Sequence, residues 1–139
     1  MPWKIIFLVL VAPVFVWADA YSDKVLVDKP VLYWRFSETS GSSIKPKVGK
    51  LEGEIVGAAK LNASGPRARI FPDFEKINSG LNLSGSGNFI RIKDPGEKSV
   101  LDFHNGDSIT LEAWINPSSL PSGYGYIIGK GRTGNPGFP

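Results

Sequence analysis

The chain of 139 residues contains no cysteine and only one histidine, His104. The absence of cysteine excludes disulfide bonds, thiolate metal sites and cysteine nucleophiles. A single histidine in a turn is expected to be solvated or to cap that turn, and no catalytic triad can be assembled around it without partners of known geometry. Core burial, a bound ion or neighbouring domains must therefore hold the fold together.

The chain also lacks a large excess of charge of either sign. The chain holds 16 basic and 13 acidic residues, which gives a formal net charge of +3. A nucleic-acid partner normally requires a clustered basic face, and the densest lysine group here consists of Lys45, Lys47 and Lys50. We interpret this group as part of a solvated loop and expect no nucleic-acid partner.

Long apolar runs are absent apart from residues 5–17, which follow Lys4. This run is shorter than the ~18 residues that a membrane-spanning helix needs, and the small residues Ala18 and Ala20 come next. The pattern predicts a signal peptide over residues 1–20, cleaved after Ala20, with cleavage after Ala18 as the near alternative. A buried N-terminal helix is the structural alternative. We expect a secreted, periplasmic or cell-surface protein without membrane insertion after cleavage.

Residues 109–116 alternate two sets of side chains, with the period of two that is typical of a strand with one face in a core. The first set is Ile109, Leu111, Ala113 and Ile115, and the second is Thr110, Glu112, Trp114 and Asn116. An Asn105-Gly106 turn precedes this strand, and Pro117 ends it because proline cannot donate to a central ladder. Another strand is predicted over residues 124–129.

Shorter elements are predicted before this strand. Residues 21–29 form one or two helical turns capped by Ser22 or Asp23, and aromatic residues favour a strand over residues 31–36. Further strands are expected over 53–59, 81–83 and 88–92, a polar loop over 37–50, a turn over 94–96, and no clear element over 62–74. Six or seven short strands with little helix predict an all-β fold, a sandwich of two packed sheets.

Four stretches together resemble the laminin-G-like domains of the concanavalin A-like lectin and glucanase superfamily. They are Asp28-Lys-Pro-Val-Leu-Tyr-Trp-Arg-Phe-Ser-Glu38, Leu81-Asn-Leu-Ser-Gly85, Phe89-Ile-Arg-Ile92 and Ile109-Thr-Leu-Glu-Ala-Trp-Ile-Asn-Pro117. The resemblance covers residues 21–139 and implies a jelly-roll sandwich of two antiparallel sheets. It also implies an exported bacterial protein that binds a glycan or a partner protein, often with calcium at the rim of the sandwich.

A jelly roll of this kind uses about a dozen strands in two sheets that cover one another. Only six or seven are counted before Pro139. We therefore expect residues 21–139 to be the N-terminal part of the domain, incomplete at its C-terminal end, and further domains to follow in the same protein.

The sequence offers no catalytic group that we can name. Glycoside hydrolysis uses two carboxylates across the scissile bond, and the predicted strand 109–116 carries only Glu112. Gly129-Lys-Gly131 lacks the spacing of a P-loop, and Gly85-Ser-Gly87 lacks the third glycine of a dinucleotide fingerprint. We expect a protein that is not an enzyme.

Aromatic side chains are the first candidates for a ligand platform. Trp34 and Trp114 could stack on a sugar ring, but large residues in regular strands usually pack in the interior, and we expect that role for both. Tyr124 and Tyr126 lie near a loop and are better placed for exposure, although packing is the expected role there too.

Calcium prefers several oxygen ligands from carboxylates and carbonyls. Six acidic residues stand in or next to predicted loops: Asp73, Glu75, Asp94, Glu97, Asp102 and Asp107. No two of them form a contiguous ligand loop, so the fold would have to assemble any site, and neither metal ligands nor ligand-binding residues can be assigned.

Two hypotheses follow for function. The first is an exported lectin-like binding module that recognises a glycan or a partner protein, with calcium as a candidate cofactor. The alternative is a structural or spacer domain of a larger exported protein whose activity lies downstream.

Overall fold

The computed structural model describes residues 19–85, 87–119 and 125–130. Within these residues one short helix, α1 (Ala20–Val27), is followed by short strands only. The strands are β1 (Tyr33–Trp34), β2 (Ser43–Ile44), β3 (Pro46–Val48), β4 (Gly53–Val56), β5 (Lys60–Ser64), β6 (Ser79–Asn82) and β7 (Phe89–Ile92). No helix of the described residues is long and apolar enough to cross a membrane.

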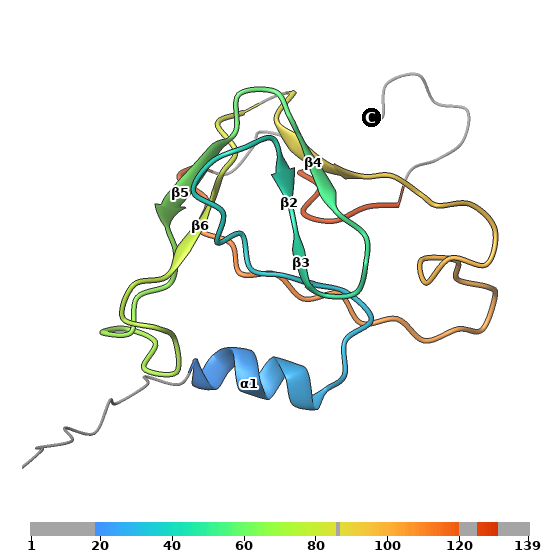
Figure 1. The fold of residues 1–139 in the computed structure, drawn as a ribbon, viewed down its shortest axis with the longest axis horizontal. Coiled ribbons are helices and arrows are strands. Elements are labelled where there is room, and N and C mark those ends of the chain that lie inside the picture. The colour runs from blue at the N-terminus through green and yellow to red at the C-terminus, as the bar shows by residue number, and fades with distance from the viewer. Residues whose placement is uncertain (1–18, 86, 120–124, 131–139) are drawn as a thin grey trace, which may run out of the picture.

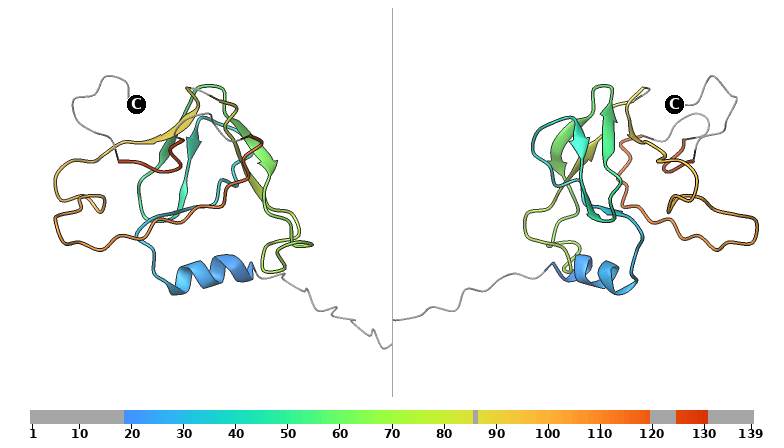
Figure 2. Two further views of the ribbon diagram at one scale, coloured as in Figure 1. Left: turned by 180° about the vertical axis from the view of Figure 1, so that it is seen from behind. Right: turned by 45° about the vertical axis from the view of Figure 1, so that its right-hand side comes forward.

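All strand pairs are antiparallel, which confirms the predicted all-β class with little helix. β1 pairs with β3, β4 lies between β2 and β7, and β5 pairs with β6. The β5–β6 pair and the β2–β4–β7 sheet approach each other at one end and diverge toward the other, where α1 lies (Figures 1 and 2).

The predictions for β4 and β7 are confirmed because their local signals are strong. The two strands pair in register from Gly53 opposite Ile92 to Val56 opposite Phe89. Their β-branched and aromatic residues suit a pleated, half-buried surface. Gly53 is required by packing, because an added Cβ would lie 2.5 Å from Cγ2 of Ile90.

The helix predicted near residue 21 is confirmed, but its cap is not the predicted one. Asp19 is the N-cap residue, and its Oδ1 accepts a hydrogen bond of 3.2 Å from the backbone N–H of Ser22. Ser22 and Asp23 lie inside the first turn instead. Because Asp19 was assigned to the leader, the helix cap was sought only among later residues.

The predicted polar loop over residues 37–50 is wrong in part, because it contains β2 and β3. Both strands are only two or three residues long, and their residues (Ser-Ile and Pro-Lys-Val) give too short a pattern for a propensity signal. They form because residues 43–44 reach β4 and residues 46–48 reach β1. No clear element was predicted over residues 62–74, but this stretch begins within β5, which pairs with β6.

The predicted strand over residues 109–116 is also wrong. The segment is irregular, and Ile109, Leu111, Trp114 and Ile115 are 50–60% exposed. Figures 1 and 2 show this segment running beside residues 30–37, but no described strand pairs with it. Residues 125–129 of the other predicted strand are irregular as well. Alternation alone cannot make a strand without a partner that bonds to its backbone.

Few apolar side chains are fully enclosed among the described residues. Ile44 is completely buried in the β2–β4–β7 sheet, and Phe74 is nearly so. Phe74 belongs to the loop between β5 and β6 and packs on Tyr21 of α1, with ring centroids 4.3 Å apart. The helix is therefore held to the strands by aromatic contacts.

Candidate functional site

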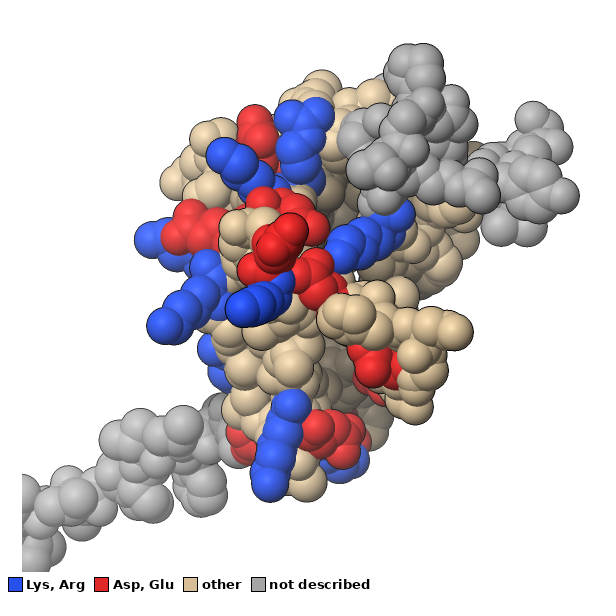
Figure 3. Space-filling model, turned by 90° about the vertical axis from the view of Figure 1, so that its right-hand side faces the viewer, with Lys and Arg blue, Asp and Glu red and all other residues tan. Residues whose placement is uncertain are grey.

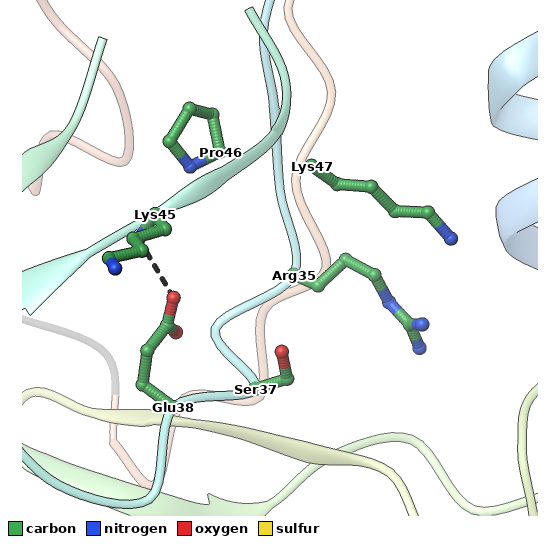
Figure 4. A pocket seen from close by; sticks show the side chains of 6 residues that line it. All are labelled: Arg35, Ser37, Glu38, Lys45, Pro46 and Lys47. Carbon is green, nitrogen blue, oxygen red and sulfur yellow. Dashed lines mark hydrogen bonds between the residues drawn. The ribbon is translucent and has the colours of Figure 1, made fainter. Parts of the chain in front are cut away.

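A polar cleft of about 370 Å³ opens between the end of β1 and the β2–β3 segment. It is lined by Arg35, Ser37, Glu38, Lys45, Pro46 and Lys47. Figure 4 shows Arg35 and Lys47 pointing to one side, toward the helix, while Glu38 and Lys45 lie on the other. Three cations and one carboxylate thus line a single concave surface.

Phe36 turns the chain between the two halves of this cleft. Its φ of 54° lies in the left-handed region, which a bulky side chain rarely adopts. Such strain persists only where the surrounding structure fixes it, and it is common at functional sites. The turn sends Arg35 toward α1 and places Ser37 and Glu38 beside β2 and β3 (Figure 4).

Arg35 is fixed by two carboxylates. Its Nη1 lies 2.7 Å from Oδ2 of Asp19 and 3.3 Å from Oε1 of Glu75. The side chains of Arg35 and Asp19 are only 16% and 9% exposed. Burial favours a lower pKa for Arg35, but the hydrogen bond that it donates to Glu75 and the two negative charges outweigh burial and raise the pKa. Arg35 is therefore a permanent cation held in one orientation.

Lys47 is anchored to the helix. Its Nζ donates a hydrogen bond of 2.8 Å to Oγ of Ser22, which is completely buried. Tyr33 lies against the same serine, and burial raises the pKa of its phenol although the hydrogen bond with Ser22 opposes this. Because the serine is enclosed, the ammonium of Lys47 is held at the edge of the cleft.

Glu38 has one satisfied and one free oxygen. Its Oε1 accepts a hydrogen bond of 2.8 Å from the backbone N–H of Lys45. Its Oε2 is buried and has no hydrogen-bond partner among the described residues. Leaving a buried carboxylate oxygen unpaired costs free energy, which distinguishes Glu38 from the other residues that line the cleft.

Trp114 forms an aromatic cluster with Tyr21, Phe71 and Phe74. Its ring centroid lies 5.7 Å from that of Tyr21, 5.0 Å from Phe71 and 4.9 Å from Phe74, each in an edge-to-face arrangement. The indole is nevertheless 52% exposed. One side of the indole packs on these rings and the other side faces solvent. The expected role of interior packing therefore describes only part of its environment.

The other aromatic candidates are less informative. Trp34 is partly buried, and its Nε1 donates to the carbonyl of Leu51 at 3.1 Å, which fits the expected packing role. Tyr126 is exposed. Tyr124 lies outside the described residues.

An acidic loop follows β7. Figure 3 shows acidic side chains gathered on the face that carries this loop, with lysine and arginine side chains around them. A cleft of about 510 Å³ is lined by Asp94, Gly96, Glu97, Lys98, Asp102 and His104. Lys130 reaches the loop from far along the chain, and its Nζ lies 3.2 Å from Asp102, 3.7 Å from Asp94 and 2.6 Å from the carbonyl of Leu101.

Asp94 and Asp102 are two of the six acidic residues from which the fold would have to assemble a calcium site. Both lie near the ammonium of Lys130, which offsets part of their negative charge. Among the described residues, no group of three or more His, Asp or Glu side chains is placed to hold a metal ion. Calcium binding stays a prediction.

The remaining predicted site residues are dispersed. Asp73 pairs with Lys24 of α1, Glu75 pairs with Arg35 after β1, and His104 lies near Asp107. His104 is exposed, and its backbone N–H donates to Oδ2 of Asp107 at 2.7 Å, as expected for a solvated turn residue. Glu112 is exposed in the irregular segment.

The carboxyl of Asp102 is expected to titrate below its ordinary pKa of 3.8. The backbone N–H of Ser99 and the ammonium of Lys130 both favour the charged form. Because the folded pKa is the lower one, Asp102 stabilises the fold above the unfolded pKa, and this contribution is lost as the pH falls through the folded value. Carboxyl-carbon NMR measures the pKa of Asp102 in the wild-type chain and in the Lys130→Met variant.

The variant should raise the pKa of Asp102 toward its ordinary value. Lys98→Met is the matched control, because the side chain of Lys98 lines the same cleft but only its backbone is bonded to Asp102. An unchanged pKa in Lys130→Met would contradict the assigned ion pair.

Sequence reasoning missed most of the polar cleft. Arg35 and Glu38 belong to a stretch that resembles the laminin-G-like domains, but Lys45 and Lys47 were interpreted as part of a solvated loop. Their spacing around Pro46 gave no usable signal, because Lys45 lies between β2 and β3 and on the other side of the cleft from Lys47 (Figure 4). No protein-family model, curated protein or solved structure matches this chain.

Proposed function

We propose that this chain is a non-enzymatic, lectin-like binding module of an exported protein, with a jelly-roll-related fold, and that the polar cleft is its ligand site. The observation that carries the proposal is Glu38, whose Oε2 is buried without a hydrogen-bond partner among the described residues and which lines one cleft with Arg35, Lys45 and Lys47. One carboxylate lines this cleft, whereas glycoside hydrolysis uses two, which favours binding over catalysis.

A glycan that carries carboxylate groups suits this cleft best. Sugar hydroxyls can donate to the carboxylate of Glu38, and the ammonium of Lys45 can pair with a carboxylate of the ligand. Arg35 and Lys47 are already engaged by Asp19, Glu75 and Ser22, so they hold the shape of the cleft. Lys45 is exposed, and its ammonium can turn to meet the ligand.

Retention on polygalacturonate tests the proposal, with a neutral glucan as the comparison and with and without calcium. In Glu38→Gln, the amide oxygen can still accept from the N–H of Lys45. An NH2 group replaces the second oxygen, and the negative charge is lost. A charged hydrogen bond to the ligand is lost, so retention should weaken by about tenfold, corresponding to ~1.4 kcal/mol. Binding constants from affinity electrophoresis give the result.

Glu52→Gln is the matched control, because Glu52 is exposed and does not line the cleft. It removes the same charge and should leave retention unchanged. Equal losses in both variants would mean that only net charge matters. A wild-type chain retained by neither polymer would overturn the proposed ligand class.

The structural-domain alternative has its own support. Ile109, Leu111 and Ile115 expose large apolar side chains on one segment, as surfaces that contact other protein do. Absence of any glycan binding in the experiment above would favour this alternative, in which the chain serves as a spacer inside a larger exported protein.

A further inference from the structure

Asp19 has two structural roles at the start of the described chain. Its Oδ1 caps α1 through the N–H of Ser22, and its Oδ2 forms the ion pair with Arg35. The carboxylate is only 9% exposed. A buried carboxylate whose counterion lies 2.7 Å away is costly to disrupt, because the partner left behind keeps an uncompensated charge. The fold therefore depends on a residue that the sequence pattern places inside the leader.

The two predicted cleavage positions differ in whether Asp19 survives. Cleavage after Ala20 removes Asp19 and also Ala20, the first residue of α1. Cleavage after Ala18 retains both. An alanine directly precedes either bond, but the spacing of Ala18 and Ala20 matches the small-residue pattern for cleavage after Ala20, whereas Val16 takes the outer position for cleavage after Ala18. The contacts of Asp19 favour cleavage after Ala18.

We propose that the leader is removed by hydrolysis of the Ala18–Asp19 peptide bond, catalysed by a signal peptidase. Water adds across this amide, so Ala18 gains a carboxylate and Asp19 gains a free amino group. The inference rests on the predicted leader and is independent of the binding function proposed above. It makes Asp19 the first residue of the exported chain and the cap of its first helix.

The new amino group does not argue against this position. A positive charge near a helix N-terminus is unfavourable because it opposes the helix dipole. Cleavage after Ala20 would place the same charge on Tyr21, inside the first turn of α1, so that position has no advantage. The backbone nitrogen of Tyr21 also donates to the carbonyl of Asp73 at 2.8 Å, and either cleavage leaves this contact available.

N-terminal sequencing and intact-mass measurement of the exported chain test the proposal directly. The full-length chain is produced in a secreting bacterial host, and the processed form should begin at Asp19. A chain that begins at Tyr21, at any other residue, or at an intact Met1 would overturn it.

A stability comparison tests the physical basis. The chain that begins at Tyr21 should have an unfolding equilibrium constant about 30-fold larger than the chain that begins at Asp19, because the cap and the ion pair are both lost. With Arg35→Met in both chains, the difference should fall to about fivefold, the contribution of the cap alone.

Asp19→Asn in the longer chain separates the two roles. Asparagine is a good N-cap but carries no charge, so this variant should lie between the two chains in stability. Equal stability of the chains that begin at Asp19 and Tyr21 would contradict the role assigned to Asp19.

Discussion

Replacing Arg35 by methionine is expected to lower the free energy of unfolding by about 3 kcal/mol, the scale for removing one partner of a buried ion pair. The change leaves Asp19 and Glu75 without their shared cation, and Asp19 is almost completely enclosed. Methionine keeps an unbranched apolar stem but lacks the guanidinium, so most of the loss reports the charged group and its ion pairs. Urea unfolding followed by far-UV circular dichroism measures it.

Arg91→Met is the matched control. Arg91 pairs with Glu54 at 3.7 Å, but their side chains are 48% and 64% exposed. Solvent screens such a pair, so the loss should stay below about 1 kcal/mol. If both variants lose the same stability, the charge of Arg35 has no special structural role.

The contrast between these two arginines shows what the sequence could predict. Arg91 alternates with Ile90 and Ile92 in a strand whose local pattern is strong, and β7 forms where expected. Arg35 also stands in an aromatic stretch, but its partners are 16 and 40 positions away in the chain, at Asp19 and Glu75. No local pattern indicates contacts over such separations.

The same reason accounts for the errors in the fold. β2 and β3 are fixed by their partners β4 and β1, not by their own residues, and were missed. Residues 109–116 have the best alternation in the chain but no described strand partner, and were wrongly predicted as a strand. Alternation reports which side chains share a face, whereas a strand also requires a neighbour for its backbone groups.

The candidate site was predictable only in part, because its charges come from different elements. Glu38 was visible as an acid after the aromatic stretch, but its free Oε2 follows from the way residues 37–47 fold back on themselves. Lys47 was interpreted as solvated, but its ammonium donates a hydrogen bond to Ser22 of α1. Residue type thus indicated available charges, and the tertiary arrangement decided which of them share a cleft.

Trp114 connects the irregular segment to the rest of the molecule, and its replacement by alanine is expected to have a comparably large effect. The indole contacts Tyr21 of α1 and both Phe71 and Phe74 of the β5–β6 loop. Removing it takes away three edge-to-face contacts and the apolar surface that they cover. We expect a loss of about 3 kcal/mol in the free energy of unfolding, the low end for tryptophan because half of the ring is exposed.

The measurement is urea unfolding followed by circular dichroism, because tryptophan fluorescence would change for trivial reasons. Ile77→Ala is the control: Ile77 is 81% exposed, and its truncation should change stability by less than about 0.5 kcal/mol. Trp114→Phe should recover part of the loss, since a smaller ring still reaches the cluster. If Trp114→Ala costs no more than Ile77→Ala, the segment is not anchored by this residue and the aromatic cluster does not join it to α1.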